Sequence, residues 1–170
     1  MQGKADAAKP KLLLGGLDEA EWKIGRKYDG MRLADRSINE RRKIMKKQPI
    51  ATQNAPQAIG PYSQAITFGD LIFTSGQLPL DPTTGKMADE SIKTATAQVI
   101  KNIEAILVEV GSSLDKVLKA TVYLKDMNDF AAMNETYAEF FGTNPPARTT
   151  IQVAKLPMDV AVEIDVIASK

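Results

Sequence analysis

The chain has 170 residues and a formal net charge of +1, with 44% hydrophobic and 25% charged residues. This length and composition are typical of one globular domain and exclude a fibrous chain. The sequence contains no His and no Cys, which excludes disulfides, thiol nucleophiles, His-based catalytic pairs and zinc sites built on these residues. Any catalysis must therefore use carboxylates, Lys, Arg, Tyr, hydroxyls, amides or backbone groups.

Charge divides the chain unevenly, with a net charge of +4 over residues 1–44 and −3 over the remainder. The mildly acidic remainder disfavours nonspecific binding to nucleic acid. No apolar run approaches the ~20 residues that span a bilayer, and the N-terminal stretch lacks the apolar region of a secretory signal. We therefore predict a cytoplasmic protein without membrane association. An organellar transit peptide is the weaker alternative, because such peptides contain few acidic residues and residues 1–44 contain several.

Residues 1–44 show little periodic apolar pattern, and Trp22 and Tyr28 are their only large anchors. We predict a flexible N-terminal extension before a domain at 45–170. Two alternatives stay open: a docking segment that orders on a partner through Trp22, and a non-native leader that ends before a natural start at Met45.

From residue 48 onward, short strand patterns alternate with helical ones. Residues 63–77 predict a hairpin with its turn at Gly69-Asp70, and residues 91–110 have the apolar spacing of a helix that ends at Gly111. A strand at 117–124 and a second helix, ending before Gly142, follow. Two last strands are centred on 148–154 and 160–168.

This order of elements predicts an α+β fold, with a sheet that carries both helices on one face. The other face is then either solvated or a surface for oligomer formation. A short connection around Leu156-Pro157 favours antiparallel pairing of the last two strands. In that case Arg148, Thr150, Glu163 and Asp165 would share one sheet face.

Arg148 is the single Arg of residues 45–170, where the other ten cations are Lys. A planar guanidinium among lysines suggests a need to grip a carboxylate or phosphate with two parallel hydrogen bonds. An internal ion pair with Glu163 or Asp165 is an equally weighted alternative. Glu163 lies between Val162 and Ile164, so partial burial would raise its pKa and suit it to proton transfer.

Three further polar residues are candidates for a ligand site, and each has a structural alternative. Ser75 follows a strand and precedes Gly76, where a hydroxyl and backbone N–H groups can approach a ligand, although Ser is also common in turns. Tyr62 offers a phenolic hydroxyl or serves as a half-buried aromatic residue. Asn134 lies in the second predicted helix, where an exposed position would also explain it.

Five segments occur in a familiar order. They are GPYSQAI (60–66), FTSGQLPLDPTTG (73–85), VYLKDMNDFAAMNETYAEFF (122–141), PPARTTIQVAKLP (145–157) and VEIDVIA (162–168). Together they resemble the reactive intermediate deaminase A family, also called RidA or YjgF, within a superfamily long labelled L-PSP endoribonuclease. The resemblance covers residues 48–170.

The resemblance implies a chorismate-mutase-like subunit with a mixed sheet, which assembles into a homotrimer with a ligand site in each inter-subunit cleft. It implies hydrolysis of enamine and imine intermediates, such as 2-aminoacrylate and 2-aminocrotonate, to 2-keto acids and ammonia. These intermediates are released by pyridoxal-phosphate (PLP) enzymes such as dehydratases. No metal or organic cofactor is expected.

The resemblance also assigns roles by position. Arg148 matches the arginine that binds the substrate carboxylate, and Glu163 matches the acidic residue that orients or activates water. Tyr62, Ser75 and Asn134 match residues around the ligand. Thr150 replaces a cysteine that many members have, so we expect substrate contact through the backbone there and no thiol-based control.

Two other functions compete with this hypothesis. The same cleft could hold 2-keto acids in a sensor or an interaction trimer without catalysis. The older superfamily label also suggests an endoribonuclease or translation inhibitor. The absence of His and the acidic remainder of the chain make the nuclease the weaker of the two.

Overall fold

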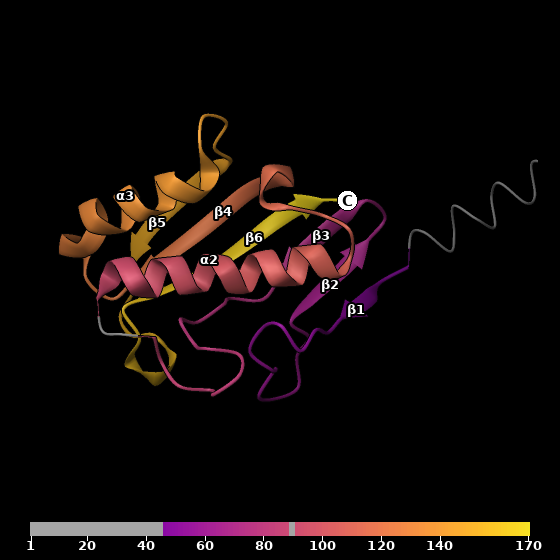
Figure 1. Ribbon diagram of the computed structural model, residues 1–170, viewed down its shortest axis with the longest axis horizontal. Coiled ribbons are helices and arrows are strands. Elements are labelled where there is room, and N and C mark those ends of the chain that lie inside the picture. Colours follow the sequence, from indigo (N-terminus) through magenta and orange to yellow (C-terminus); the bar gives the residue numbers. More distant parts are fainter. Residues whose placement is uncertain (1–45, 89–90) are drawn as a thin grey trace, which may run out of the picture. The chain divides into compact units, whose positions relative to one another are not determined.

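A computed structural model describes residues 46–88 and 91–170. The predicted extension at 1–44 lies outside these residues, so its three interpretations stay predictions. The described part folds into six strands and two α-helices, joined by loops and short 3₁₀ turns (Figure 1). The strands are β1 (Gln48–Ile50), β2 (Ala65–Phe68), β3 (Leu71–Thr74), β4 (Val117–Leu124), β5 (Ala147–Gln152) and β6 (Val162–Ser169), and the helices are α2 (Ile92–Glu109) and α3 (Phe130–Phe141).

The predicted hairpin is confirmed by β2 and β3, which pair in antiparallel fashion. Gly69 has φ +63 in the turn between them, a backbone conformation that glycine adopts without steric cost. The short strand β1 was not predicted from the sequence, because it has three residues and includes Pro49. It pairs with β2 at the edge of the sheet, where a proline is tolerated.

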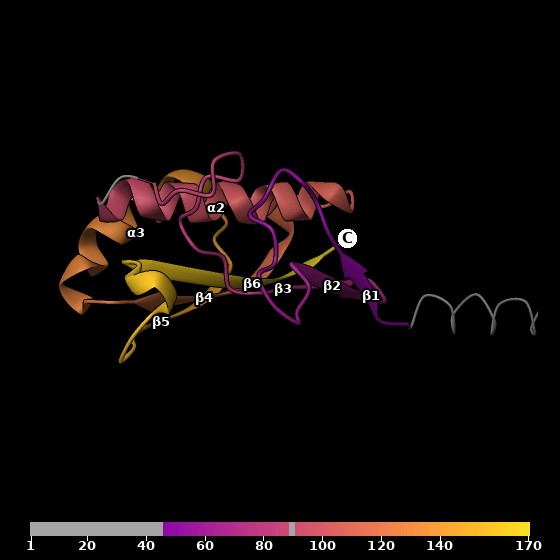
Figure 2. The same ribbon diagram turned by 90° about the horizontal axis from the view of Figure 1, so that it is seen from below.

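Both helices cover the same face of the sheet, as predicted, and the opposite face is uncovered in the described chain (Figure 2). Apolar residues of α2 at helical spacing, among them Val99, Ile103 and Ile106, are fully buried in the shared core. Val122 of β4 and Ile164 of β6 are fully buried in the same core. Burial of each such side chain contributes roughly 1.5–3 kcal/mol, so the core between the helices and the sheet supplies the main stabilisation of the fold.

The strand order β1-β2-β3-β6-β4-β5 corrects one expectation from the sequence. The last two strands are not neighbours, because β4 lies between them and pairs parallel to β5 and antiparallel to β6. The segment that joins β5 to β6 therefore passes the end of β4 instead of forming a hairpin. The sheet is mixed, as expected.

This pairing places the four polar residues of the last strands on two faces. Ala120 of β4 pairs with Arg148 on one side and with Val166 on the other, which puts Arg148 on the helix-covered face. Thr150 shares that face through its pairing with Val122. Glu163 and Asp165 lie on the uncovered face, so the expected four-residue cluster is wrong for a single chain. The predicted alternation of side chains between the two faces is correct within β5 and within β6. Which residues of the two strands share a face depends on β4, which lies between them.

Candidate active site

Glu163 projects from β6 on the uncovered face, opposite Tyr123 of β4. The segment after β3 runs beside β6, where Gln77 and Ile164 exchange two backbone hydrogen bonds of 2.8 and 3.2 Å. This places Gly76 directly against the Glu163 carboxylate: a Cβ on Gly76 would lie 1.8 Å from Glu163 Oε1. Position 76 therefore accepts no side chain while the carboxylate stays where it is.

The carboxylate of Glu163 is partly buried at the edge of a hollow of about 420 Å³. Burial, followed by the charge of Asp165, raises the pKa of Glu163 above its ordinary value, as the sequence predicted. The hollow is also lined by Thr74, Gly76 and Lys155. A carboxylate with a raised pKa, open to a hollow of this size, can accept a proton and return it.

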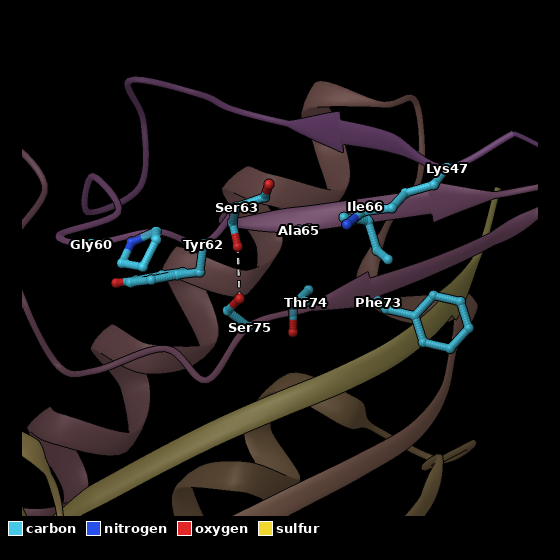
Figure 3. A pocket seen from close by; sticks show the side chains of 10 residues that line it. Lys47, Gly60, Tyr62, Ser63, Ala65, Ile66, Phe73, Thr74 and Ser75 are labelled. Carbon is cyan, nitrogen blue, oxygen red and sulfur yellow. Dashed lines mark hydrogen bonds between the residues drawn. The ribbon is translucent and has the colours of Figure 1, made fainter.

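A second hollow, of about 630 Å³, lies along β2 and β3 and contains Tyr62 and Ser75 (Figure 3). The Ser75 hydroxyl donates to the Ser63 carbonyl at 2.7 Å, and its backbone N–H donates to the Gln64 carbonyl. Ser75 can therefore meet a ligand as an acceptor, through the remaining lone pairs of its hydroxyl. Thr74 lines both hollows, so Ser75 and Tyr62 lie next to the Glu163 site.

Tyr62 is 53% exposed, so it is close to the half-buried aromatic residue expected as one alternative. Its hydroxyl accepts the backbone N–H of Ile59 at 3.3 Å, and its backbone N–H donates to Gly60 at 2.9 Å. The loop thus presents the phenol ring at the rim of the second hollow, where a ligand or another protein surface can cover it.

The side chain of Arg148, a residue of β5, lies against α3 and lines neither hollow. Its Nη2 donates to Asn134 Oδ1 at 2.6 Å, and its Cζ lies 4.5 Å from the centre of the Tyr137 ring and 5.8 Å from that of Phe130. Glu163 and Asp165 are not its partners, so the alternative of an internal ion pair is wrong for the described chain. Asn134 is a partner of Arg148 and not a merely exposed helix residue. The hydroxyl of Thr150 is buried without a hydrogen-bond partner among the described residues.

The predicted site residues therefore form two groups within one chain. Tyr62, Ser75 and Glu163 line or adjoin the two hollows that share Thr74, and the linings of these hollows include neither Arg148 nor Asn134 nor Thr150. Sequence reasoning missed Gly76 and Tyr137. A glycine two residues after β3, in SGQ, and a tyrosine three positions after Asn134 were the available signals. Among the described residues, no three acidic side chains converge in a way that could hold a metal ion.

Comparisons with known proteins agree with the fold and the motifs. A family profile described as Endoribonuclease L-PSP matches residues 52–170. The chain is 56% identical over 124 residues to a RutC family protein of Pyrococcus horikoshii, which covers 73% of this chain and 98% of that protein. It is 46% identical over 122 residues to the 2-iminobutanoate/2-iminopropanoate deaminase of Salmonella typhimurium, covering 70% of this chain and 94% of that enzyme.

A solved structure of Escherichia coli TdcF with bound serine is similar, with a TM-score of 0.69 and 42% identity. The similarity covers 72% of this chain and 98% of TdcF. Matches of this identity and coverage, in sequence and in fold, establish the relationship. The chain therefore belongs to the RidA/YjgF family, the group that the L-PSP endoribonuclease profile describes.

Proposed function

We propose that this protein hydrolyses 2-imino acids and their enamine tautomers, such as 2-aminoacrylate and 2-aminocrotonate, to 2-keto acids and ammonia. The observation that carries the proposal is the Glu163 carboxylate, partly buried against Gly76 beside an open hollow and with a raised pKa. The similarity to the Salmonella deaminase supports the same reaction. PLP-dependent dehydratases, which release such intermediates, would supply the substrate.

Arg148 provides the second element of the mechanism. Its guanidinium is bound by the neutral amide of Asn134 and by aromatic rings, so its positive charge has no carboxylate partner among the described residues. A guanidinium can bind a carboxylate with two parallel hydrogen bonds. In the proposal Arg148 binds the carboxylate of the imino acid and sets the orientation of its C2 carbon.

Glu163 would then act on water. With the substrate as its iminium ion, the carboxylate accepts a proton from a water molecule as the water oxygen forms a bond to C2, and the C=N π electrons move to nitrogen, which becomes a neutral amine. The protonated Glu163 returns its proton to the nitrogen of this carbinolamine, the C–N bond breaks and ammonia leaves. The regenerated carboxylate takes up the hydroxyl proton as the C=O bond forms, and that proton then passes to ammonia or solvent. The products are a 2-keto acid and ammonia. Ser75 and Tyr62 would orient the substrate and the water from the adjoining hollow.

Because Arg148 and Glu163 lie on opposite faces of the sheet, the two groups do not meet within one subunit. We propose that a site forms where Arg148 of one copy approaches Glu163 of another, in a chorismate-mutase-like homotrimer with three such clefts. The uncovered sheet face, which carries apolar side chains such as Phe73 and Ile167 in register, supports association through that face. Thr150 would lie near the substrate through its position beside Arg148.

The test is a coupled assay in which a serine/threonine dehydratase generates 2-aminoacrylate or 2-aminocrotonate and ammonia release is followed. Wild-type protein should accelerate release. Arg148→Lys keeps the charge but loses the two-pronged contact, so kcat/KM should fall by about 10- to 100-fold, the equivalent of one or two charge-assisted hydrogen bonds. Lys93→Ala, which breaks an exposed ion pair with Glu135, is the matched control and should act like wild type. Near-normal activity of Arg148→Lys would contradict the carboxylate-binding role.

A binding protein without catalysis is the second candidate, and it is favoured by the structure of TdcF with bound serine. In that case the protein would bind 2-keto acids tightly while ammonia release in the coupled assay stayed at the uncatalysed rate. Ribonuclease activity stays the weaker alternative, because the chain has no His. RNA cleavage that is lost in both Arg148→Ala and Glu163→Ala would support it.

A cytoplasmic location belongs to the proposal. Among the described helices, none is long and apolar enough to cross a membrane.

A further inference from the structure

The side chain of Arg148 is held by residues that share one face of α3. We propose that Asn134 and Tyr137 are positioning residues, which fix the orientation of the Arg148 guanidinium and keep its charge available for a ligand carboxylate. This inference depends on the proposed function only in taking Arg148 as the carboxylate-binding group. Phe130, Asn134 and Tyr137 are spaced four and three residues apart, so they form a continuous stripe facing β5.

Asn134 offers an acceptor without a charge. Its Oδ1 accepts one N–H of Arg148 Nη2 at 2.6 Å, and no other described side chain hydrogen-bonds to this guanidinium. The remaining N–H donors can therefore meet a carboxylate. An Asp at position 134 would provide the same hydrogen bond but would also neutralise the guanidinium. The neutral amide therefore orients the Arg148 guanidinium without neutralising its positive charge.

The carboxylates of the same helix are directed away from this cluster. Glu135 pairs with Lys93 at 2.7 Å, with both side chains largely exposed, and Glu139 is also exposed. Neither residue lies in the stripe that faces Arg148. The helix thus contributes amide and aromatic groups to Arg148 and keeps its negative charges on the solvent side.

Tyr137 supports the guanidinium with the face of its ring. Tyr137 is 4% exposed, and its ring stacks on Phe141 with 4.3 Å between ring centres. Arg148 Cζ lies 4.5 Å from the centre of the Tyr137 ring. The Tyr137 hydroxyl has no hydrogen-bond partner among the described residues. The ring, which is immobilised by Phe141, is therefore the part that contacts Arg148, and a cation–π interaction holds the guanidinium plane.

The experiment measures two quantities on purified full-length variants: kcat and KM in the coupled imine assay, and the Kd for 2-ketobutyrate by calorimetry. Asn134→Asp should raise both KM and Kd about tenfold or more, with kcat within about twofold, because an ion pair competes with the ligand carboxylate. Tyr137→Leu should raise KM and Kd in the same way, and Tyr137→Phe should restore wild-type values because it keeps the ring. Glu135→Gln is the control on the solvent side of α3 and should leave KM and Kd unchanged.

The outcomes separate the two proposals. If the wild-type protein binds 2-ketobutyrate but does not hydrolyse imines, the proposed function fails, while weaker binding by Asn134→Asp still supports the positioning role. A merely structural role would lower the unfolding temperature and the active fraction while KM and Kd stayed at wild-type values. Wild-type KM and Kd in folded Asn134→Asp and Tyr137→Leu would overturn the inference.

Discussion

The Glu163 carboxylate and the backbone of Gly76 lie in such close contact that a Cβ at position 76 would fall 1.8 Å from Oε1 and 2.7 Å from the carboxyl carbon Cδ. The two residues come from different segments, which the backbone hydrogen bonds between Gln77 and Ile164 bring together. Gly76 thereby determines where the proposed proton-transfer group sits.

The first prediction concerns this contact. Gly76→Ala should displace the Glu163 side chain and lower kcat by about 100-fold, because a misplacement of about 1 Å is enough for such a loss. The unfolding temperature should change little, since the displaced atoms are the end of a flexible side chain. Steady-state kinetics and thermal unfolding measure both effects. Gly76→Ala/Glu163→Ala should be no less active than Glu163→Ala alone, and additive losses would contradict the prediction.

The second prediction concerns a site shared between copies. Arg148→Ala and Glu163→Gln should each be inactive alone, yet regain activity when the two are denatured together and refolded as a mixture. Random assembly leaves about one quarter of the clefts with both native side chains, so activity should approach a quarter of the wild-type value. Refolding each variant separately is the control. Absence of recovery in mixtures that form trimers would show that the two residues do not act in one shared cleft.

The third prediction concerns pH. The pKa of Glu163 is raised, mainly by burial and then by Asp165, so the folded state binds its proton more tightly than the unfolded state. The protonated Glu163 therefore stabilises the folded state below the ordinary pKa of Glu. This contribution is lost as the pH rises through the raised pKa of the folded state. In an Arg148→Ala background, where no guanidinium of another copy can lower this pKa, Glu163→Gln should therefore raise the unfolding temperature at pH 7, and the gain should vanish near pH 4.

A matched control has the opposite sign. The hydrogen bond and charge of Lys93 lower the pKa of Glu135, so Glu135→Gln should lose a small amount of stability at pH 7 and none well below its lowered pKa. Unfolding curves from pH 4 to 8 compare the two variants. In the Arg148→Ala background, a Glu163→Gln variant that is less stable than its parent at pH 7 would contradict the assigned pKa direction.

The fourth prediction concerns Met158, which has φ +55 in the turn before β6 and is 57% exposed. A left-handed conformation costs a residue with a long side chain roughly 1–2 kcal/mol, whereas Asn tolerates it better. Met158→Asn should therefore raise the free energy of unfolding by about 0.5–1 kcal/mol. Chemical denaturation measures the change. Met127→Asn, at an exposed Met outside the positive-φ residues, should bring no gain, and an equal gain in both variants would show that backbone strain is not the cause.

The local pattern of the chain predicted most of the fold. Residues 117–124 form a strand with the predicted bounds, and the helices at 92–109 and 130–141 end within two residues before Gly111 and Gly142, as expected. Apolar periodicity and turn residues act over a few positions, which is why these elements could be identified without tertiary information. The partial burial of Glu163 followed in the same way from its apolar neighbours.

What the tertiary structure decided is which strand lies beside which. The alternation of β5 and β6 was visible in the sequence, but only the insertion of β4 between them places Arg148 and Glu163 on opposite faces. The approach of Gly76 to Glu163 and the support of Arg148 by Tyr137 likewise join residues that are distant along the chain or in different elements. Side-chain alternation is a local property of a strand, whereas pairing depends on long-range contacts that no short sequence window contains.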